Sequence, residues 1–197
     1  ACAPYRRLHL CHHNLESIQT NNYNSGNAKH NLLVDVCMAA KYKGDLIKTH
    51  YTPYQAIYGD SQLCTVLARS FADIGDIIRG KDLYLGNPQE KTEREQLENN
   101  LKTIFEKIHE GLDHRIKSNY NDAPYYYKLR EDWWYINRKM VWRAITCGAG
   151  SGKYFRPTCG SGGDAIRTPN QCRCGSYKVP TYFDYVPQYL RWFEEWA

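Results

Sequence analysis

Hydrophobic residues in the stretch 61–80 recur at steps of three and four positions, which is the period of an amphipathic α-helix. These residues are Leu63, Val66, Leu67, Phe71, Ile74, Ile77 and Ile78. Asp60 or Ser61 is a suitable N-cap, and Gly80 stands where a left-handed residue would end the helix after Arg79. The pattern predicts a helix of about five turns, against whose broad apolar face the rest of the chain packs.

Gly75 interrupts this predicted helix. A glycine inside a helix costs about 1 kcal/mol relative to alanine, so it needs a reason. We expect Gly75 to mark either a close crossing of two helices or a kink.

A second helical pattern precedes this stretch. It begins at Ala28 and ends at about Lys43, and a second short helical piece is expected between Gly44 and Pro53. Its apolar positions are Leu32, Leu33, Val36, Cys37 and Ala40. This helix is the first expected partner of the one at 61–80.

Further helical patterns follow residue 80. One begins at Asn87 and Pro88, an N-cap followed by proline at the first helical position, and its polar face alternates Glu with Lys or Arg. Its apolar positions are Leu97, Leu101, Ile104, Ile108, Leu112 and Ile116. After a turn at 119–124, the next helix has apolar positions at Leu129, Trp133, Ile136, Met140 and Ala144. A last helix starts at Val186 and Pro187, with Leu190, Phe193 and Trp196 on one side.

Amphipathic helices joined by short connections predict a mainly α fold, an antiparallel helix bundle. Residues 1–27 lack a sustained period and are expected to form a cysteine-containing cap and loop, whereas residues 28–197 form the bundle. Within the bundle, residues 147–180 are rich in Gly, Ser, Pro and Cys and predict a long cysteine-rich loop. Because the sequence stops inside the last helix, we expect it to be truncated at the start of a further subdomain.

Cysteine usage indicates an oxidising compartment. The chain has eight cysteines: Cys2, Cys11, Cys37, Cys64, Cys147, Cys159, Cys172 and Cys174. Zinc sites favour C-x-x-C pairs, and the only close pair here is Cys172-x-Cys174, so disulfides are the better interpretation. Eight cysteines allow about 105 pairings, and the pairing stays open, although antiparallel helices could bring Cys37 opposite Cys64. Disulfides would restrict the conformations of the long loop.

Charge is the most informative feature for function. The chain carries a net charge of +5, and the region 148–180 contains one acid, Asp164, against five cations. These cations are the candidate ligand-binding residues: Lys153, Arg156, Arg167, Arg173 and Lys178. A basic loop held open by disulfides suits sulfated or sialylated glycans and acidic protein surfaces. Nucleic acid fits the charge but not the oxidising compartment.

No motif supports catalysis, a metal or a cofactor. The stretch 148–153 reads G-A-G-S-G-K, but a phosphate-binding loop needs Gly where Cys147 stands, Ser or Thr where Tyr154 stands, and a preceding strand. His12 and His13 are adjacent and cannot share a helix face as metal ligands. The 17 Tyr and 5 Trp suit contact surfaces as well as cores. No apolar run is long enough to insert this segment into a membrane.

Several motifs follow one another along the chain: C-A-P-Y-R-R-L-H-L-C (2–11), D-V-C-M-A-A-K-Y (35–42), Q-L-C-T-V-L-A-R-S-F-A-D-I-G-D-I-I-R-G-K-D-L-Y (62–84), W-R-A-I-T-C (142–147), Y-F-R-P-T-C (154–159), C-R-C (172–174) and D-Y-V-P-Q-Y-L-R-W-F-E-E-W (184–196). Together they resemble the Duffy-binding-like domain family, and most of all its alpha class in the variant erythrocyte membrane protein of Plasmodium falciparum. They span essentially the whole chain, and the family continues beyond residue 196.

The resemblance implies a disulfide-stabilised helical fold, no enzymatic activity and no cofactor. It also implies an extracellular position on the infected erythrocyte, antigenic variation under host antibodies, and adhesion to host erythrocyte or endothelial receptors. Heparan sulfate, blood-group sugars and complement receptor, linked to rosetting, are the receptors it suggests. A structural and antigenic spacer, whose receptor contacts lie in neighbouring domains, is the alternative, and a zinc-stabilised or nucleotide-hydrolysing protein is a third hypothesis.

Overall fold

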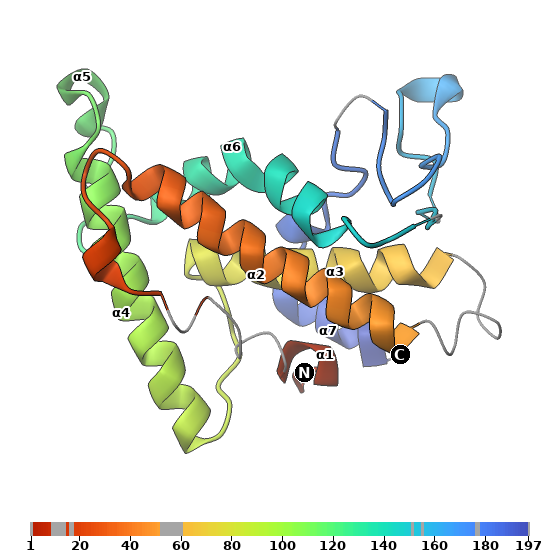
Figure 1. The fold of residues 1–197 in the computed structure, drawn as a ribbon, viewed down its shortest axis with the longest axis horizontal. Helices are drawn as coiled ribbons and strands as arrows, with labels where there is room; N and C mark the ends of the chain where they lie inside the picture. Colours follow the sequence, from red (N-terminus) through yellow and green to blue (C-terminus); the bar gives the residue numbers. More distant parts are fainter. Residues whose placement is uncertain are drawn as a thin grey trace.

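The computed structural model describes residues 2–8, 15, 18–51, 61–150, 152–154, 156–175 and 178–196 (Figure 1). Within these ranges the regular elements are helices, and β-structure is limited to isolated bridges. The α-helices are α1 (Tyr5–Leu8), α2 (Ala28–Tyr51), α3 (Ser61–Arg79), α4 (Pro88–Glu110), α5 (His114–Lys117), α6 (Tyr127–Ile145) and α7 (Gln188–Trp196). Short 3-10 turns are η1 (Thr20–Asn22), η3 (Gly162–Asp164) and η4 (Phe183–Tyr185). The predicted mainly α, disulfide-stabilised fold is confirmed.

Helix α3 lies at the centre, in contact with α1, α2, α6, η4 and α7. In Figure 1, α2 runs in the opposite direction to α3, and α4 stands across one end of both. The predicted helix is confirmed from its first residue to its last, and Val66 alone of its seven predicted apolar residues is only partly buried. Gly80 adopts φ +71°, and the Lys81 amide donates to the Asp76 carbonyl at 2.8 Å, as expected of a helix ended by a left-handed residue. Asp60 lies outside the described residues.

Gly75 marks a close crossing of α3 and α6. A Cβ atom at this position would lie 2.7 Å from Cζ2 of Trp134, whose side chain is fully buried. The glycine therefore makes room for the indole ring, as a close helix crossing requires.

The helix end predicted near Lys43, just before Gly44, is wrong. Helix α2 does not end near Lys43 but continues to Tyr51 as one element. A Cβ atom at Gly44 would lie 2.0 Å from the backbone oxygen of Ile145, at the end of α6. The glycine is present because α2 and α6 touch there, not because the helix stops.

Helix α4 begins as predicted. The Asn87 side chain accepts from the Glu90 amide at 3.0 Å, and the Glu90 carboxylate accepts from the Asn87 amide at 2.8 Å, with Pro88 at the first position. These reciprocal bonds form a capping box. The helix ends at Glu110, so Leu112 and Ile116, expected on its apolar face, lie beyond it.

The buried faces of α6 and α7 differ in part from those predicted. In α6, Leu129 and Trp133 are buried as expected. Ile136 and Met140 are exposed, at 66% and 45%, whereas α6 turns Trp134, Arg138 and Trp142 inward. In α7 the expected apolar residues are likewise exposed: Leu190, Phe193 and Trp196. Its buried side is formed by Gln188, Arg191 and Trp192.

Buried ion pairs explain these orientations. Arg191 binds both Asp73 and Asp76 of α3, and Arg138 places its guanidinium 2.6 Å from Asp184. A buried carboxylate is costly unless a cation and hydrogen bonds satisfy it, so each arginine must face inward. The apolar residues on the opposite sides of α6 and α7 consequently face outward.

Candidate functional site: a basic pocket on the cysteine-rich loop

Two disulfides fasten the cysteine-rich loop. Cys64 of α3 bonds to Cys172 across 108 residues, with Cα atoms 5.5 Å apart, and Cys159 bonds to Cys174 across 15 residues. The first bridge ties the loop to the central helix, and the second closes the loop on itself. The loop folds beyond the C-terminal end of α6 (Figure 1).

Three of the described cysteines are unpaired in this structure, and the sequence had left the pairing open. Cys2, Cys37 and Cys147 are free thiols in this structure, and Cys11 lies outside the described residues. Cys37 does not bond to Cys64, whose partner is Cys172 of the folded-back loop. Burial raises the pKa of the half-buried Cys37 thiol to about 11, which keeps it protonated at neutral pH.

Hydrogen bonds hold the loop against α6. The Trp142 indole donates to the Cys172 carbonyl at 3.1 Å, and the Cys172 amide donates to the Gly152 carbonyl at 2.8 Å. The Tyr154 amide donates to the Thr168 hydroxyl at 2.7 Å. These bonds give the basic side chains a fixed scaffold.

Arg173 serves as a cap for α6. Its guanidinium donates to the Thr146 hydroxyl at 2.7 Å, to the Arg143 carbonyl at 2.5 Å and to the Gln171 side chain at 3.0 Å. A cation at this end complements the negative pole of the helix dipole. Partial burial, and then repulsion by Arg143, lower the pKa of Arg173 from its ordinary value.

A pocket of about 230 Å³ opens beside Arg173. Three of its lining residues are cations, Arg143, Arg173 and Lys178, and Asn170 adds an amide. Trp142 and Pro169 form apolar walls, and no acid lines the pocket. Three cations around one concave surface attract anions, and Arg143 and Lys178 are exposed enough to reach one.

The structure brings together two of the five predicted binding residues. Arg173 and Lys178 line the pocket, whereas Lys153, Arg156 and Arg167 are exposed on the loop without lining it. Sequence reasoning missed Arg143, which belongs to α6 and resembles any charged residue on a solvated helix face. Its signal was its position, one helical turn before Cys147, where the loop starts.

Neither a metal site nor a membrane-spanning helix is found in the parts of the chain that the structure describes. Within them no three side chains of His, Cys, Asp or Glu are placed to hold a metal ion. The histidines His12 and His13 fall outside these parts. None of the described helices is both long and apolar enough to cross a lipid bilayer.

A helical bundle with a disulfide-fastened basic loop defines a class of disulfide-stabilised binding module, and comparison identifies the family. The Duffy binding domain family matches residues 1–191, and this chain belongs to that family. The predicted resemblance to Duffy-binding-like domains is thereby confirmed. Domains of this family are binding domains and not enzymes.

Solved structures agree with this assignment. The chain is 42% identical to the NTS-DBL1α1 domain of PfEMP1 from the varO strain of Plasmodium falciparum, with a TM-score of 0.80 over 100% of this chain and 43% of that one. It is 34% identical to a DBLβ domain of PfEMP1 bound to human ICAM-1, with a TM-score of 0.71 over 97% of this chain and 38% of that one.

A more distant structure, the P. falciparum erythrocyte binding antigen 140, is 23% identical, with a TM-score of 0.61 over 99% of this chain and 25% of that one, and it shares the fold. The chain thus spans less than half the length of each of these structures. No curated protein matches.

Proposed function

We propose that this chain is part of a non-catalytic adhesion domain that is displayed on the infected red-cell surface and binds host receptors. The support is its family membership and its likeness to a DBLβ domain of PfEMP1 bound to human ICAM-1. Host erythrocyte or endothelial receptors are the partners, and host antibodies recognise its variable exterior. We further propose that the chain divides into a cap (1–27) and a bundle (28–197).

The basic pocket is the proposed point of contact with an anionic receptor group. The observation that carries this proposal is the meeting of Arg143, Arg173 and Lys178 at one cavity without an acid. Sulfate and carboxylate groups of a glycan such as heparan sulfate fit this chemistry, since Arg forms paired hydrogen bonds with such oxygens. Blood-group sugars and complement receptor stay further candidates for other surfaces. Lys153, Arg156 and Arg167 would add long-range attraction.

Heparin-affinity chromatography of the oxidised chain tests this siting with three variants. Arg143→Gln with Lys178→Gln removes two pocket cations but leaves the Arg173 cap intact. Lys153→Gln with Arg156→Gln and Arg167→Gln removes the other loop cations, and Lys29→Gln with Lys91→Gln removes two exposed cations elsewhere. Each charge-assisted hydrogen bond to heparin should stabilise the complex by about 1 kcal/mol. Because the pocket variant loses two cations, it should bind heparin at least about tenfold more weakly.

The three variants separate the hypotheses. Losses in proportion to the number of charges removed, two, three and two, would mean that net charge alone drives retention. An unchanged pocket variant would show that the siting is wrong. If the oxidised chain binds neither heparin, red cells nor endothelial receptors, the alternative role as a structural and antigenic spacer is favoured.

A further inference from the structure

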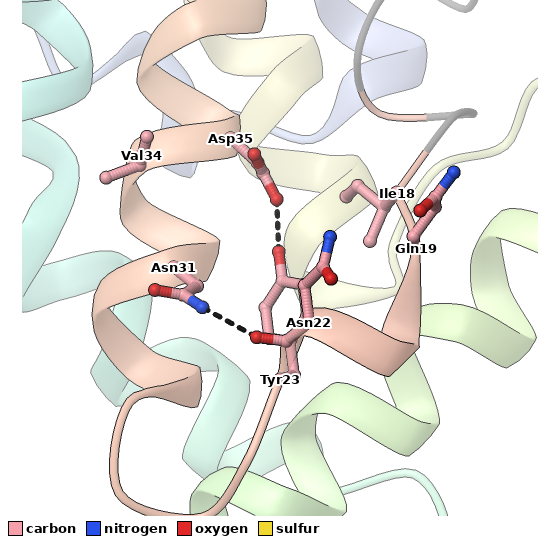
Figure 2. A pocket seen from close by; sticks show the side chains of 7 residues that line it. All are labelled: Ile18, Gln19, Asn22, Tyr23, Asn31, Val34 and Asp35. Atoms are coloured by element: carbon pink, nitrogen blue, oxygen red, sulfur yellow. Dashed lines mark hydrogen bonds between the residues drawn. The ribbon is translucent and has the colours of Figure 1, made fainter.

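A second pocket, of about 400 Å³, lies between the N-terminal half of α2 and the segment 18–23 (Figure 2). Its walls differ from those of the basic pocket, since its single charged group is the carboxylate of Asp35. The other lining side chains are the amides of Gln19, Asn22 and Asn31, the phenol of Tyr23, and the apolar groups of Ile18 and Val34. In a chain with a net charge of +5, this is a locally acidic cavity.

Hydrogen bonds fix two sides of this cavity. The Tyr23 hydroxyl donates to Oδ2 of Asp35, and the Asn31 amide donates to the Asn22 carbonyl at 2.9 Å (Figure 2). Burial, and then the bond to Asp35, raise the pKa of Tyr23, so that the phenol stays a donor. The Lys107 ammonium, which does not line the pocket, donates to the carbonyls of Thr20 and Tyr23, at 2.8 and 3.0 Å. These bonds hold segment 18–23 against α2 and α4 in this structure.

Several hydrogen-bond acceptors that line this pocket have no donor among the described residues. Within the described residues, the half-buried Asp35 forms no ion pair, and its Oδ1 accepts no hydrogen bond. Oδ1 of Asn31 has no donor in the same ranges. The side-chain amides of Gln19 and Asn22 are also without such bonds there, so each can turn its oxygen inward. A half-buried carboxylate surrounded by acceptors calls for a cationic donor.

We propose that this pocket binds the basic side chain of a protein partner, an arginine in preference to a lysine. A planar guanidinium offers five donors, which suits Oδ1 of Asp35 together with the amide oxygens around it. Ile18 and Val34 provide apolar surface on which the methylene stem can lie. Charge complementarity identifies the occupant, and the site is distinct from the basic pocket, which takes ligands of the opposite sign.

The surroundings favour a protein over a free small molecule. Val34 and Met38 are 60% and 52% exposed and lie one turn apart on the outer face of α2, and Tyr42 continues the same stripe. A pocket that anchors one charged side chain beside an exposed apolar stripe is the arrangement of a protein-binding hot spot.

The test uses ¹H–¹⁵N NMR titration of the oxidised chain with Nα-acetyl-arginine amide and its neutral isostere Nα-acetyl-citrulline amide. We expect arginine to shift resonances of residues 18–23 and 31–38 with a dissociation constant on the order of 1 to 10 mM, as for a small fragment. Citrulline should bind at least tenfold more weakly. Asp35→Asn should weaken arginine binding at least tenfold while its side-chain oxygen still accepts from Tyr23, and Asp45→Asn on the same helix should change nothing.

A tripeptide with leucine on both sides of arginine should bind several-fold more tightly than the single residue, and Met38→Ser should remove that gain. Several outcomes would overturn the proposal: equal binding of citrulline, unchanged binding by Asp35→Asn, or no shifts in residues 18–38. Shifts there with a methyl glycoside but not with arginine would assign the pocket to sugar hydroxyls instead. The comparison of arginine with citrulline uses the natural chain, so it tests whether the pocket selects a cation even if Asp35→Asn fails to fold.

Discussion

Arg191 of α7 lies 2.8 Å from Asp73 of α3, and both side chains are fully buried. The two residues are 118 positions apart in the sequence. Arg6 of α1 reaches the same carboxylate at 2.5 Å. One carboxylate of the central helix thus binds an arginine from α1 and an arginine from α7. The two ends of the chain also lie close together, because the Trp196 indole donates to the Cys2 carbonyl at 2.8 Å.

Removing Arg191 should destabilise the fold strongly. In Arg191→Met the buried carboxylates of Asp73 and Asp76 lose a cation, and breaking a buried pair on one side costs about 3 to 5 kcal/mol. The free energy of unfolding from a urea titration measures the effect. Arg115→Gln is the control, because Arg115 pairs with Asp113 on an exposed turn and should leave the midpoint unchanged. A similar midpoint for both variants would contradict the structural role of Arg191.

Asp76 should give the stability a characteristic pH dependence. Burial raises its pKa to about 6, against the pull of Arg191 and Arg79, from an ordinary value of 3.8. The folded chain therefore binds this proton more tightly than the unfolded chain does. The contribution of Asp76 is fully present below about pH 4 and is lost as the pH rises through 6.

The pH effect can be isolated by comparing the chain with its Asp76→Asn variant in urea at pH 4.5 and pH 7. Acidification should stabilise the natural chain relative to the variant by on the order of 2 kcal/mol. Asp73 acts in the opposite sense, because Arg6 and Arg191 outweigh its burial and hold its pKa below the ordinary value. Because Asp73 and Asp76 share Arg191, the double difference also contains any change that the substitution causes at Asp73. A value of zero would contradict the raised pKa of Asp76.

The two disulfides should differ in their importance. Cys64–Cys172 closes a loop of 108 residues and Cys159–Cys174 one of 15. By loop-closure entropy, their removal should cost about 4 to 5 and about 3 kcal/mol, respectively. Guanidinium unfolding of Cys64→Ala with Cys172→Ala, and of Cys159→Ala with Cys174→Ala, measures both. The reverse order would show that local packing, not chain entropy, governs their contribution.

Gly44 should not tolerate a side chain, although alanine favours a helix by about 1 kcal/mol. In Gly44→Ala the new methyl group would meet the Ile145 backbone, which cannot turn aside as a side chain can. We expect a net loss of about 1 to 3 kcal/mol and a lower melting temperature. Gly163→Ala, where a Cβ meets nothing within 4 Å, should melt like the natural chain. Equal melting of the two variants would mean that α2 and α6 can separate at little cost.

Features that depend on neighbours in the sequence could be predicted from the sequence. The limits of α3 and the Asn87 cap of α4 follow from periodicity and local hydrogen bonds, which adjacent residues specify by themselves. The sequence left two roles open for Gly75, a crossing or a kink, and only the contact with Trp134 of α6 decides for the crossing. The presence of a fastened basic loop also follows from composition, because four cysteines and five cations lie between positions 147 and 178.

The tertiary structure alone decided which faces of α6 and α7 are buried, which cysteines pair and where the basic pocket forms. In the sequence, Arg138 and Arg191 resemble solvent-exposed residues, but they form buried ion pairs with Asp184 and Asp73 from distant segments. Because these arginines face inward, Ile136 and Phe193 on the opposite sides of their helices face outward. Arg143 joins the pocket only because Cys64 draws the loop back onto α6. Local bonds are specified within a few residues, whereas the pairing of buried charges and sulfurs requires the whole chain to be folded.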